Sequence, residues 1–299
     1  MEFRILGPLE VRTELGAVAL PGVKPRAVLA VLLLNANEPV SAERLAVALW
    51  GDEAPAGAAK TVQVHVSRLR KALGDADIVA TTPAGYRLQL NGAELDADRF
   101  ERHVEDGRRA LAAGQPEHAG TILREALALW RGPPLADLAF EPFAQPEIAR
   151  LEEQRLSALE VRVEADLAAG RHAALVGELQ QLVALHRTRE RLAGQLMLAL
   201  YRCGRQAEAL EAYRDARRVL VAEVGIEPGP ELRGLHEAVL RQDASLDAPA
   251  VAAELPHELD TAAAPPLAGR APELASLHEC WERARNGTGA VVTLSGEHG

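Results

Sequence analysis

A change in sequence texture near residue 94 constrains the fold of this 299-residue chain more than any other feature. Before it, short β-prone runs alternate with amphipathic segments and with turns rich in glycine or proline. After it, as far as residue 243, Ala, Leu, Arg and Glu recur at helical spacing and no β-prone run follows. The length is enough for about two domains with their own cores. We therefore expect an α+β domain over 1–93 and an all-α domain over 94–243.

The stretch 60–73 predicts an amphipathic helix. Its apolar stripe, at i, i+4, i+7 and i+11, consists of Val62, Val66, Leu69 and Leu73. The opposite face consists of Lys60, Val64, Ser67, Arg68 and Lys71. That face holds cations and no carboxylate, and Gly74 follows as a C-cap. Such a helix fits the major groove of duplex DNA, whereas periodicity alone would favour an ordinary solvated charged face.

The other elements of the first domain follow from turn and cap residues. We expect a small antiparallel sheet, a buried helix with proline in its first position, a second helix with a serine N-cap, and a β-hairpin after the basic helix. In chain order these are Phe3–Val11 with Ala17–Leu20, Pro25 to about Asn35, Ser41 to Trp50-Gly51, and Ile78–Thr82 with Tyr86–Leu90 around Pro83-Ala-Gly85.

Charge and cysteine content limit the classes of function. The formal net charge of −10 argues against nucleic-acid binding by the whole chain, but residues 1–93 carry ten Lys+Arg against nine Asp+Glu. Any DNA-binding surface must therefore be a local patch in the first third. Two cysteines are too few for a disulfide framework or a thiolate zinc site, and no signal peptide or long apolar run is present. We expect a cytoplasmic protein that is associated with the nucleoid and not with a membrane.

Three glycines divide the second domain. Gly114, Gly170 and Gly204 each lie between the end of one helical segment and the start of another. Gly170 and Gly204 are 34 residues apart, the tetratricopeptide period, and Gly114 precedes Gly170 by 56, one repeat plus a 22-residue insertion. The insertion should include Arg131–Asp137 and its proline-broken continuation to Pro146. The domain is predicted to be a helical-repeat domain, a class that binds other proteins on a concave face.

The order of sheet, three helices and hairpin resembles an OmpR-type winged helix with an extra N-terminal sheet, most clearly through Lys60–Leu73 and Thr82–Arg87. In that geometry the third helix enters the major groove and the hairpin lies beside it. The predicted DNA-binding residues are Lys60, Thr61, Gln63, Val64, Ser67, Arg68, Arg70, Lys71, Thr82, Gly85, Tyr86 and Arg87. Arg68 is the candidate for a bidentate guanine contact, and Lys60 and Lys71 for phosphates. His65 is expected to pack, and for Gly85-Tyr86 a plain packed turn is as reasonable as DNA contact.

Two further segments, Trp130–Asp137 and Glu227–Arg233, resemble the signatures of the bacterial transcriptional activation domain. Placed behind an OmpR-type winged helix, they resemble the Streptomyces antibiotic regulatory proteins, the SARP activators, over about residues 1–243. The resemblance implies binding to direct repeats of promoter DNA near the −35 element, as a side-by-side pair, and recruitment of RNA polymerase holoenzyme through its sigma factor and other subunits. It also implies control of a secondary-metabolite gene cluster, such as one for an antibiotic.

The last residues have a different character. Residues 244–266, rich in Ala, Pro and acids, are expected to be a linker. Leu267–Leu274 resembles the entry of STAND or NB-ARC ATPases, and Ala290–Gly299 reads as a strand entering a glycine-rich loop. If Gly296 begins G-x-x-x-x-G-K-[ST], the chain stops before the lysine and the hydroxyl. We therefore expect residues 267–299 to be the truncated start of such a domain, as in the large AfsR-type SARPs, without ATPase activity.

The two other classes of function are an enzyme and a protein-binding scaffold. An enzyme is disfavoured, because the sequence holds no zinc-ligand spacing, no G-x-S-x-G elbow and no complete nucleotide loop. No cofactor is expected. A helical-repeat scaffold whose winged helix binds protein instead of DNA stays open, because the first domain is nearly neutral.

Overall fold

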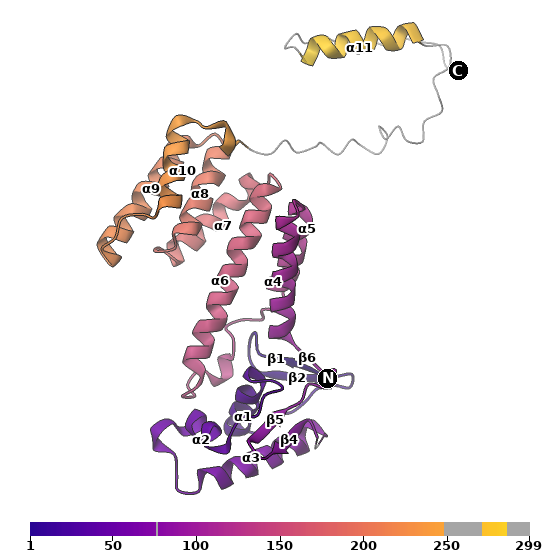
Figure 1. Cartoon of the computed structure of the whole chain (residues 1–299), viewed down its shortest axis with the longest axis vertical. Coiled ribbons are helices and arrows are strands. Elements are labelled where there is room, and N and C mark those ends of the chain that lie inside the picture. The colour runs from indigo at the N-terminus through magenta and orange to yellow at the C-terminus, as the bar shows by residue number, and fades with distance from the viewer. Residues whose placement is uncertain (76, 248–270, 286–299) are drawn as a thin grey trace. The chain divides into compact units, whose positions relative to one another are not determined.

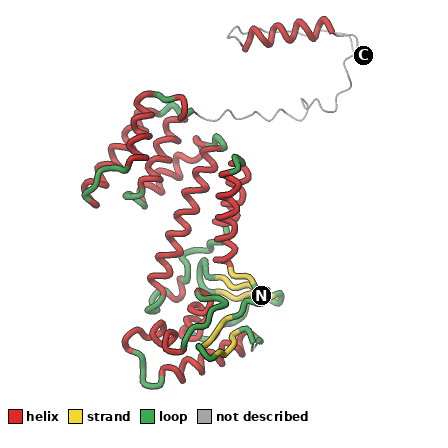
Figure 2. The backbone as a smooth tube through the Cα atoms, in the orientation of Figure 1, coloured by secondary structure: helices red, strands yellow, loops and turns green. Residues whose placement is uncertain are grey.

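A computed structural model describes residues 1–75, 77–247 and 271–285. The chain divides into two compact units, residues 1–251 and 252–299. Figures 1 and 2 show the path of the first unit from a small mixed region of strands and helices into a helical region. The predicted fold class, an α+β winged helix followed by an all-α helical-repeat domain, is confirmed.

The N-terminal sheet has four strands in the order β3-β2-β1-β6. The strands are β1 (Glu2–Arg4), β2 (Glu10–Thr13), β3 (Gly16–Ala17) and β6 (Glu94–Leu95). The first three pair in an antiparallel manner as predicted, but β6 pairs with β1 in parallel, with Phe3 opposite Leu95. Purely antiparallel pairing was therefore a wrong expectation at this edge. Chain that includes three helices and a hairpin separates β1 from β6, and a connection of that length permits a parallel return.

Three helices and a two-stranded hairpin complete the first domain. They are α1 (Val23–Leu34), α2 (Ala42–Trp50) with the short 3-10 turn η1 (Gly51–Glu53), α3 (Ala58–Leu73), β4 (Val79–Thr82) and β5 (Gly85–Leu88). The predicted caps are confirmed: the Ser41 side chain accepts a hydrogen bond from the backbone N–H of Arg44, and Gly74 ends α3 in the left-handed region. Pro25 lies at the third position of α1 and not the first, which costs no hydrogen bond because the first four N–H groups of a helix have no partner within it.

The second domain consists of seven α-helices and three short helical turns among the described residues. They are α4 (Asp96–Ala112), α5 (Pro116–Leu127), η2 (Ala136–Leu138), α6 (Ala144–Ala168), α7 (His172–Leu185), α8 (Glu190–Arg202), α9 (Gln206–Val219), η3 (Leu220–Val224), α10 (Pro230–Arg241) and η4 (Ala244–Leu246). Consecutive helices pack on one another from α4 to α9, and α10 packs against α8 and α9.

The three predicted glycines end helices in the same way. Gly114, Gly170 and Gly204 have φ values of 72°, 76° and 75°, in the region that only glycine adopts at little cost. In each case the N–H of the next residue bonds to the carbonyl five residues earlier, as Arg205 does to Leu200 at 2.9 Å. This is the Schellman arrangement, and it confirms the helix ends inferred from the spacing.

Two hydrophobic cores hold the first unit together. One runs from Phe3 in the sheet through α1–α3 into α4–α6, where it ends near Ala165. The other is formed by the end of α6 and by α7–α10. The winged helix and the first helical repeat therefore share one continuous core, and burial of apolar surface stabilises them together.

The structure describes only part of the last residues, and the domain predictions there stay predictions. In the second unit, α11 (Ala271–Arg285) is a helix. The predicted linker beyond residue 247, and the strand and glycine-rich loop predicted in 290–299, lie outside the described residues. No helix in the described ranges is long and apolar enough to cross a membrane, and they hold no group of three or more His, Cys, Asp and Glu that could bind a metal ion.

Candidate nucleic-acid interface

Helix α3 is docked by its apolar stripe. Val62, Val66, Leu69 and Leu73 are at most 5% exposed and pack towards α1 and α2. Burying four such side chains stabilises the docked helix by roughly 6–12 kcal/mol before entropy is counted. The orientation of α3 is therefore fixed by its own periodicity, and its other side faces outward.

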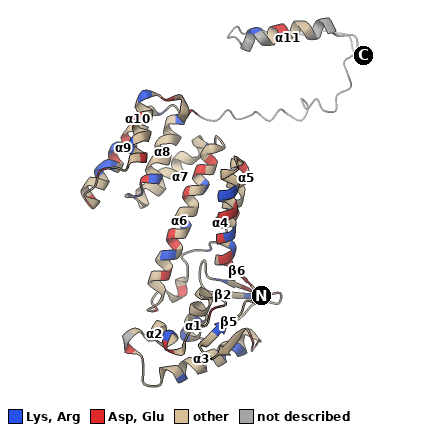
Figure 3. Cartoon of the chain, in the orientation of Figure 1, with Lys and Arg blue, Asp and Glu red and all other residues tan. Residues whose placement is uncertain are grey.

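The outward side of α3 is cationic. Lys60, Arg68 and Lys71 are exposed, and no Asp or Glu lies anywhere in α3. Figure 3 shows blue positions and no red ones along this helix. Within the described part of the first domain, the cations that form ion pairs are Arg4, Lys24 and Arg26, none of them on α3. The three α3 cations are therefore free to meet an anionic partner.

Uncharged side chains fill the space between these cations. Gln63, Val64 and Ser67 are exposed, with Val64 46% accessible, and Thr61 is half-buried at the edge. An amide, a hydroxyl and a methyl-bearing side chain are the groups that read base edges in the major groove. The predicted residues of α3, apart from Arg70, thus lie together on one accessible face.

Arg70 bonds to the hairpin and does not lie with the other predicted residues on the accessible face of α3. Its guanidinium donates to the carbonyl of Val79, at 2.9 Å from Nε, and to the hydroxyl of Thr81 at 2.8 Å. Both acceptors belong to β4, so Arg70 ties the basic helix to the hairpin beside it. No sequence pattern indicates this bond, because the two partners lie on separate elements joined by a loop.

The hairpin turns at Pro83-Ala84, and Gly85 belongs to strand β5 instead of the predicted turn. Gly85 has φ +132°, and a Cβ there would lie 2.1 Å from the carbonyl oxygen of Val40. The reason is the neighbouring pairing of Val40 with Tyr86, whose backbone bonds measure 2.8 and 2.9 Å. Glycine is thus required by a close backbone approach, and Tyr86 packs against the core. DNA contact by either residue stays a prediction.

The remaining hairpin residues are Thr82 and Arg87. Thr82 is half-buried and its hydroxyl donates to the carbonyl of Gly85 at 3.2 Å. Arg87 is also half-buried, with a buried Nε that has no hydrogen-bond partner in the described structure. DNA contact by Thr82 and Arg87 stays a prediction.

His65 lies beneath the cationic face, as the packing prediction requires. It is 9% exposed, and its ring centroid is 6.4 Å from that of Trp50. Burial lowers the pKa of His65, with smaller contributions from the charges of Arg68 and Lys24. The imidazole is therefore neutral near pH 7 and acts as part of the support of α3.

A segment that the sequence predicted to be part of an insertion, and whose first half resembles a family signature, holds the winged helix in place. We call residues 130–141 the strap. Its backbone bonds to the first domain, from the N–H of Arg131 to the carbonyl of Leu6 at 2.8 Å and from Leu135 to Ile5 at 3.1 Å. Its first residue, Trp130, packs edge-on against Phe100 with ring centroids 5.4 Å apart. The strap therefore lies between the two domains and contacts both.

Charged groups of the strap complete this contact. The Asp137 carboxylate accepts from the backbone N–H of Leu9 at 2.7 Å and pairs with Arg26, whose Nε lies 2.9 Å away. Glu141 pairs with Lys24 at 2.8 Å. The resemblance of Trp130–Asp137 to a family signature was the only sequence signal for this role.

Asp96, at the start of α4, is a second junction between the domains. It is 3% exposed and accepts from the N–H groups of Ile5 at 2.8 Å and Leu6 at 3.0 Å, with Arg131 at 3.7 Å. Burial raises the pKa of Asp96, although these N–H groups and Arg131 act in the opposite direction. The α4 N-terminus is thereby fastened to the loop after β1.

The fold and this face together define a winged-helix protein fused to a helical-repeat domain, with a basic third helix at its surface. Comparisons with known proteins identify the same two domains. Residues 95–240 match the family model of the bacterial transcriptional activator domain, and residues 20–88 match that of the transcriptional regulatory protein C-terminal domain.

Among similar proteins, the regulatory protein DnrI of Streptomyces peucetius is 40% identical over 257 residues, 83% of this chain and 94% of that relative. Regulatory protein AfsR of Streptomyces griseus is 41% identical over 84% of this chain but only 26% of its own length. The solved structure of Mycobacterium tuberculosis EmbR in complex with a low affinity phosphopeptide has a TM-score of 0.77 at 41% identity, and the match covers 81% of this chain and 65% of that one. The chain belongs to the SARP family of transcriptional regulators.

Proposed function

We propose that this protein is a transcription activator that binds promoter DNA in a sequence-specific manner through α3. One observation carries the proposal: Lys60, Arg68 and Lys71 are exposed and unpaired within the described residues, on a helix whose opposite side is fully docked. A rigid helix with a cationic, carboxylate-free outer face is suited to the major groove. The nearly neutral charge of the whole domain does not oppose this, because phosphate contacts depend on the local patch.

The exposed residues divide into two roles. Arg68, which lies between Lys60 and Lys71 along the helix, would contact guanine, whose two major-groove acceptors match the guanidinium fork. Lys60 and Lys71, at the two ends of the helix, are placed for phosphates, which fix register and carry no sequence information. Arg70 acts by holding the hairpin against α3, so that Arg87 reaches the DNA at a fixed distance from the helix.

The family resemblance supports the rest of the proposal. The protein would bind direct repeats near the −35 element as a side-by-side pair. The helical domain would then contact RNA polymerase holoenzyme, including its sigma factor, at promoters of a secondary-metabolite cluster. Residues 267–299 would begin the ATPase domain of a longer AfsR-type protein, with residues 1–93, 94–243 and 244–266 as DNA-binding domain, activation domain and linker.

Salt dependence provides the test. Footprinting on promoters of the source organism would define a site, and anisotropy titrations at rising salt would then measure affinity. We expect the logarithm of the binding constant to fall linearly with the logarithm of salt concentration, and Lys71→Ala to reduce the slope by about one. Arg109→Ala, which removes an exposed cation from α4, should leave the slope unchanged. Failure to bind any duplex at low ionic strength would rule the proposal out.

The alternative, a scaffold whose winged helix binds protein, predicts a different result. The near-neutral first domain is the observation that favours it. In that case α3 would bind a protein partner with weak salt dependence, and Lys71→Ala would not change any DNA-binding slope because none would exist. Promoter activation that persists after removal of residues 94–243 would separately contradict the role given to the helical domain.

A further inference from the structure

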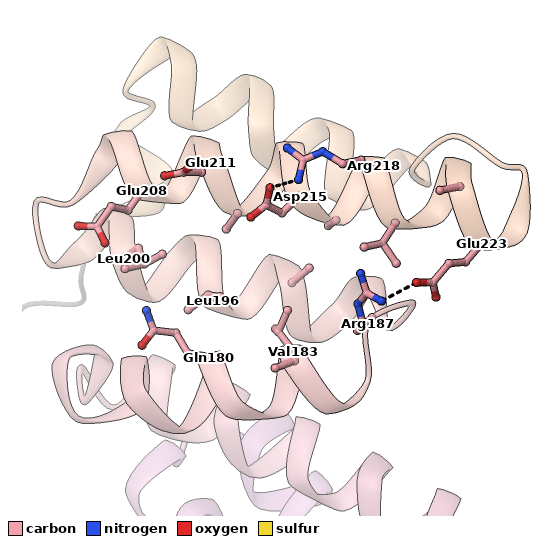
Figure 4. Close-up of a pocket in the computed structure, with 16 residues that line it drawn as sticks. Gln180, Val183, Arg187, Leu196, Leu200, Glu208, Glu211, Asp215, Arg218 and Glu223 are labelled. Carbon is pink, nitrogen blue, oxygen red and sulfur yellow. Dashed lines mark ion pairs between the residues drawn. The ribbon is translucent and has the colours of Figure 1, made fainter.

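A groove of about 500 Å³ runs between α7, α8 and α9 in the helical domain. Figure 4 shows its two sides, with Gln180 and Val183 on one and the acids of α9 on the other. None of its lining residues belongs to the winged helix, so it is separate from the candidate nucleic-acid interface. Helical-repeat domains commonly use such concave surfaces to bind protein segments.

The floor of the groove is apolar. Leu196 and Leu200 of α8 are 6% and 3% exposed, and Ala216 of α9 is 6% exposed. Val183 of α7 and Val219 of α9 are half-buried above them. A partner that placed aliphatic side chains here would cover the exposed parts of Val183 and Val219.

The α9 rim of the groove is acidic. Glu208, Glu211 and Asp215 are exposed and follow one another at i, i+3 and i+7, so that they lie on one side of the helix. On another side of α9, Arg214 and Arg217 line a different hollow with Tyr213 and His236. The α9 side of the groove therefore carries three acids and one arginine, Arg218, which also lines the other hollow.

One of these acids is available to a ligand. Glu208 pairs with Arg205 at 2.6 Å and Asp215 pairs with Arg218 at 2.9 Å. At the far end of the groove, Arg187 pairs with Glu223 at 2.7 Å. Glu211 lies between the first two and has no ion pair within the described residues. A cation from a partner would therefore be attracted to Glu211 without first breaking a pair.

We propose that this groove binds a basic amphipathic helix of a protein partner. The aliphatic row of that helix would lie on Leu196, Leu200 and Val183, and its flanking Lys or Arg would meet Glu211. Charge complementarity selects this occupant over an acidic one, since the lining carries four acids and two arginines. The proposal deepens the protein-contact role given to the helical domain, and DNA binding by α3 does not enter it.

A pair of synthetic peptides tests the proposal with the full chain. One has leucines at i, i+3, i+4 and i+7 flanked by lysines, and the other has glutamates in place of the lysines. Anisotropy should show binding of the basic peptide, weakened by salt, and no binding of the acidic one. Equal binding of both peptides, or of neither, would overturn the proposal.

Variants then locate the binding surface. Glu211→Lys should weaken binding of the basic peptide by about threefold to tenfold, because an attractive pair becomes a repulsive one. Ala184→Arg, at an exposed position of the other rim, should also weaken it. Glu125→Lys on α5 makes the same charge change at an exposed position outside the groove and should have no effect. An unchanged affinity in Glu211→Lys, with an unchanged melting temperature, would overturn the proposal.

Sedimentation tests whether a second copy of the chain fills the groove, and duplex binding serves as a control. If the protein self-associates in sedimentation and Glu211→Lys abolishes this, the groove is filled by a second copy and the assignment to a different partner is wrong. Duplex binding by Glu211→Lys should equal that of the unmodified chain. If the unmodified chain binds duplex DNA but not the basic peptide, only this inference fails. If it binds the basic peptide but no duplex, only the proposed function fails.

Discussion

Asp137 offers the sharpest test of how the DNA-binding domain is held. The change is Asp137→Ala, which removes the acceptor for the backbone N–H of Leu9 and the partner of Arg26. An unsatisfied, partly buried N–H costs about 1–3 kcal/mol. The ion pair adds about 1 kcal/mol, because both side chains are about one quarter exposed and solvent screens them. The total expected loss in the free energy of unfolding is about 2–4 kcal/mol.

A second variant separates the two contributions. Asp137→Asn keeps a carbonyl oxygen for the N–H of Leu9 and loses only the charge, so it should cost about 1 kcal/mol. In a double-mutant cycle, adding Arg26→Ala to Asp137→Asn should cost only about a further 1 kcal/mol, because the pair is already gone and the remaining loss is the bond from Arg26 to the carbonyl of Leu9 at 2.8 Å. Urea unfolding followed by tryptophan fluorescence and by circular dichroism measures both variants.

The outcome that would refute this reasoning is specific. If Asp137→Ala lies within about 0.5 kcal/mol of the unmodified chain, the Asp137 carboxylate does not hold the first domain, since surface changes are normally that small. If Asn is as damaging as Ala, the charge and not the hydrogen bond dominates. Glu125→Ala, at an exposed position of α5, serves as the control and should be neutral.

Three other predictions concern the winged helix. Arg68→Ala should lose about 1–3 kcal/mol on a specific site and relax one base position, whereas equal loss on random duplex would argue against base reading. Gly85→Ala should cost at least about 2 kcal/mol in urea unfolding, because its Cβ would meet the Val40 carbonyl at 2.1 Å and its φ is strained; a near-neutral result would contradict the close approach. Burial lowers the pKa of His65, so the unfolded chain takes up a proton more readily than the folded one, and the free energy of unfolding falls as pH drops below about 6.5. The fall in the free energy of unfolding between about pH 7.5 and 5.5 should be smaller for His65→Gln than for the unmodified chain. The contributions of the shifted groups His236 and Asp96 are the same in the two proteins and cancel in this comparison.

Local patterns determined much of this protein in advance. The stripe of α3, the Ser41 cap and the three helix-ending glycines depend on residues within a few positions of one another. Helix periodicity and the left-handed cap need no distant partner, which is why the sequence alone was sufficient for them. The cationic outer face of α3 was also predictable from the sequence alone, because residues at helical spacing lie on one side of a helix wherever that helix packs.

Tertiary structure decided which of those residues are free and what holds them. Arg70 shares the spacing of a DNA-facing cation, yet its donors are used by β4. Asp96 and Asp137 bond to a loop about 90 and 128 positions earlier in the chain, and β6 returns beside β1 in parallel. Contacts at such separations depend on how whole elements pack, and packing is set by the shape of a shared core that no short stretch of sequence contains.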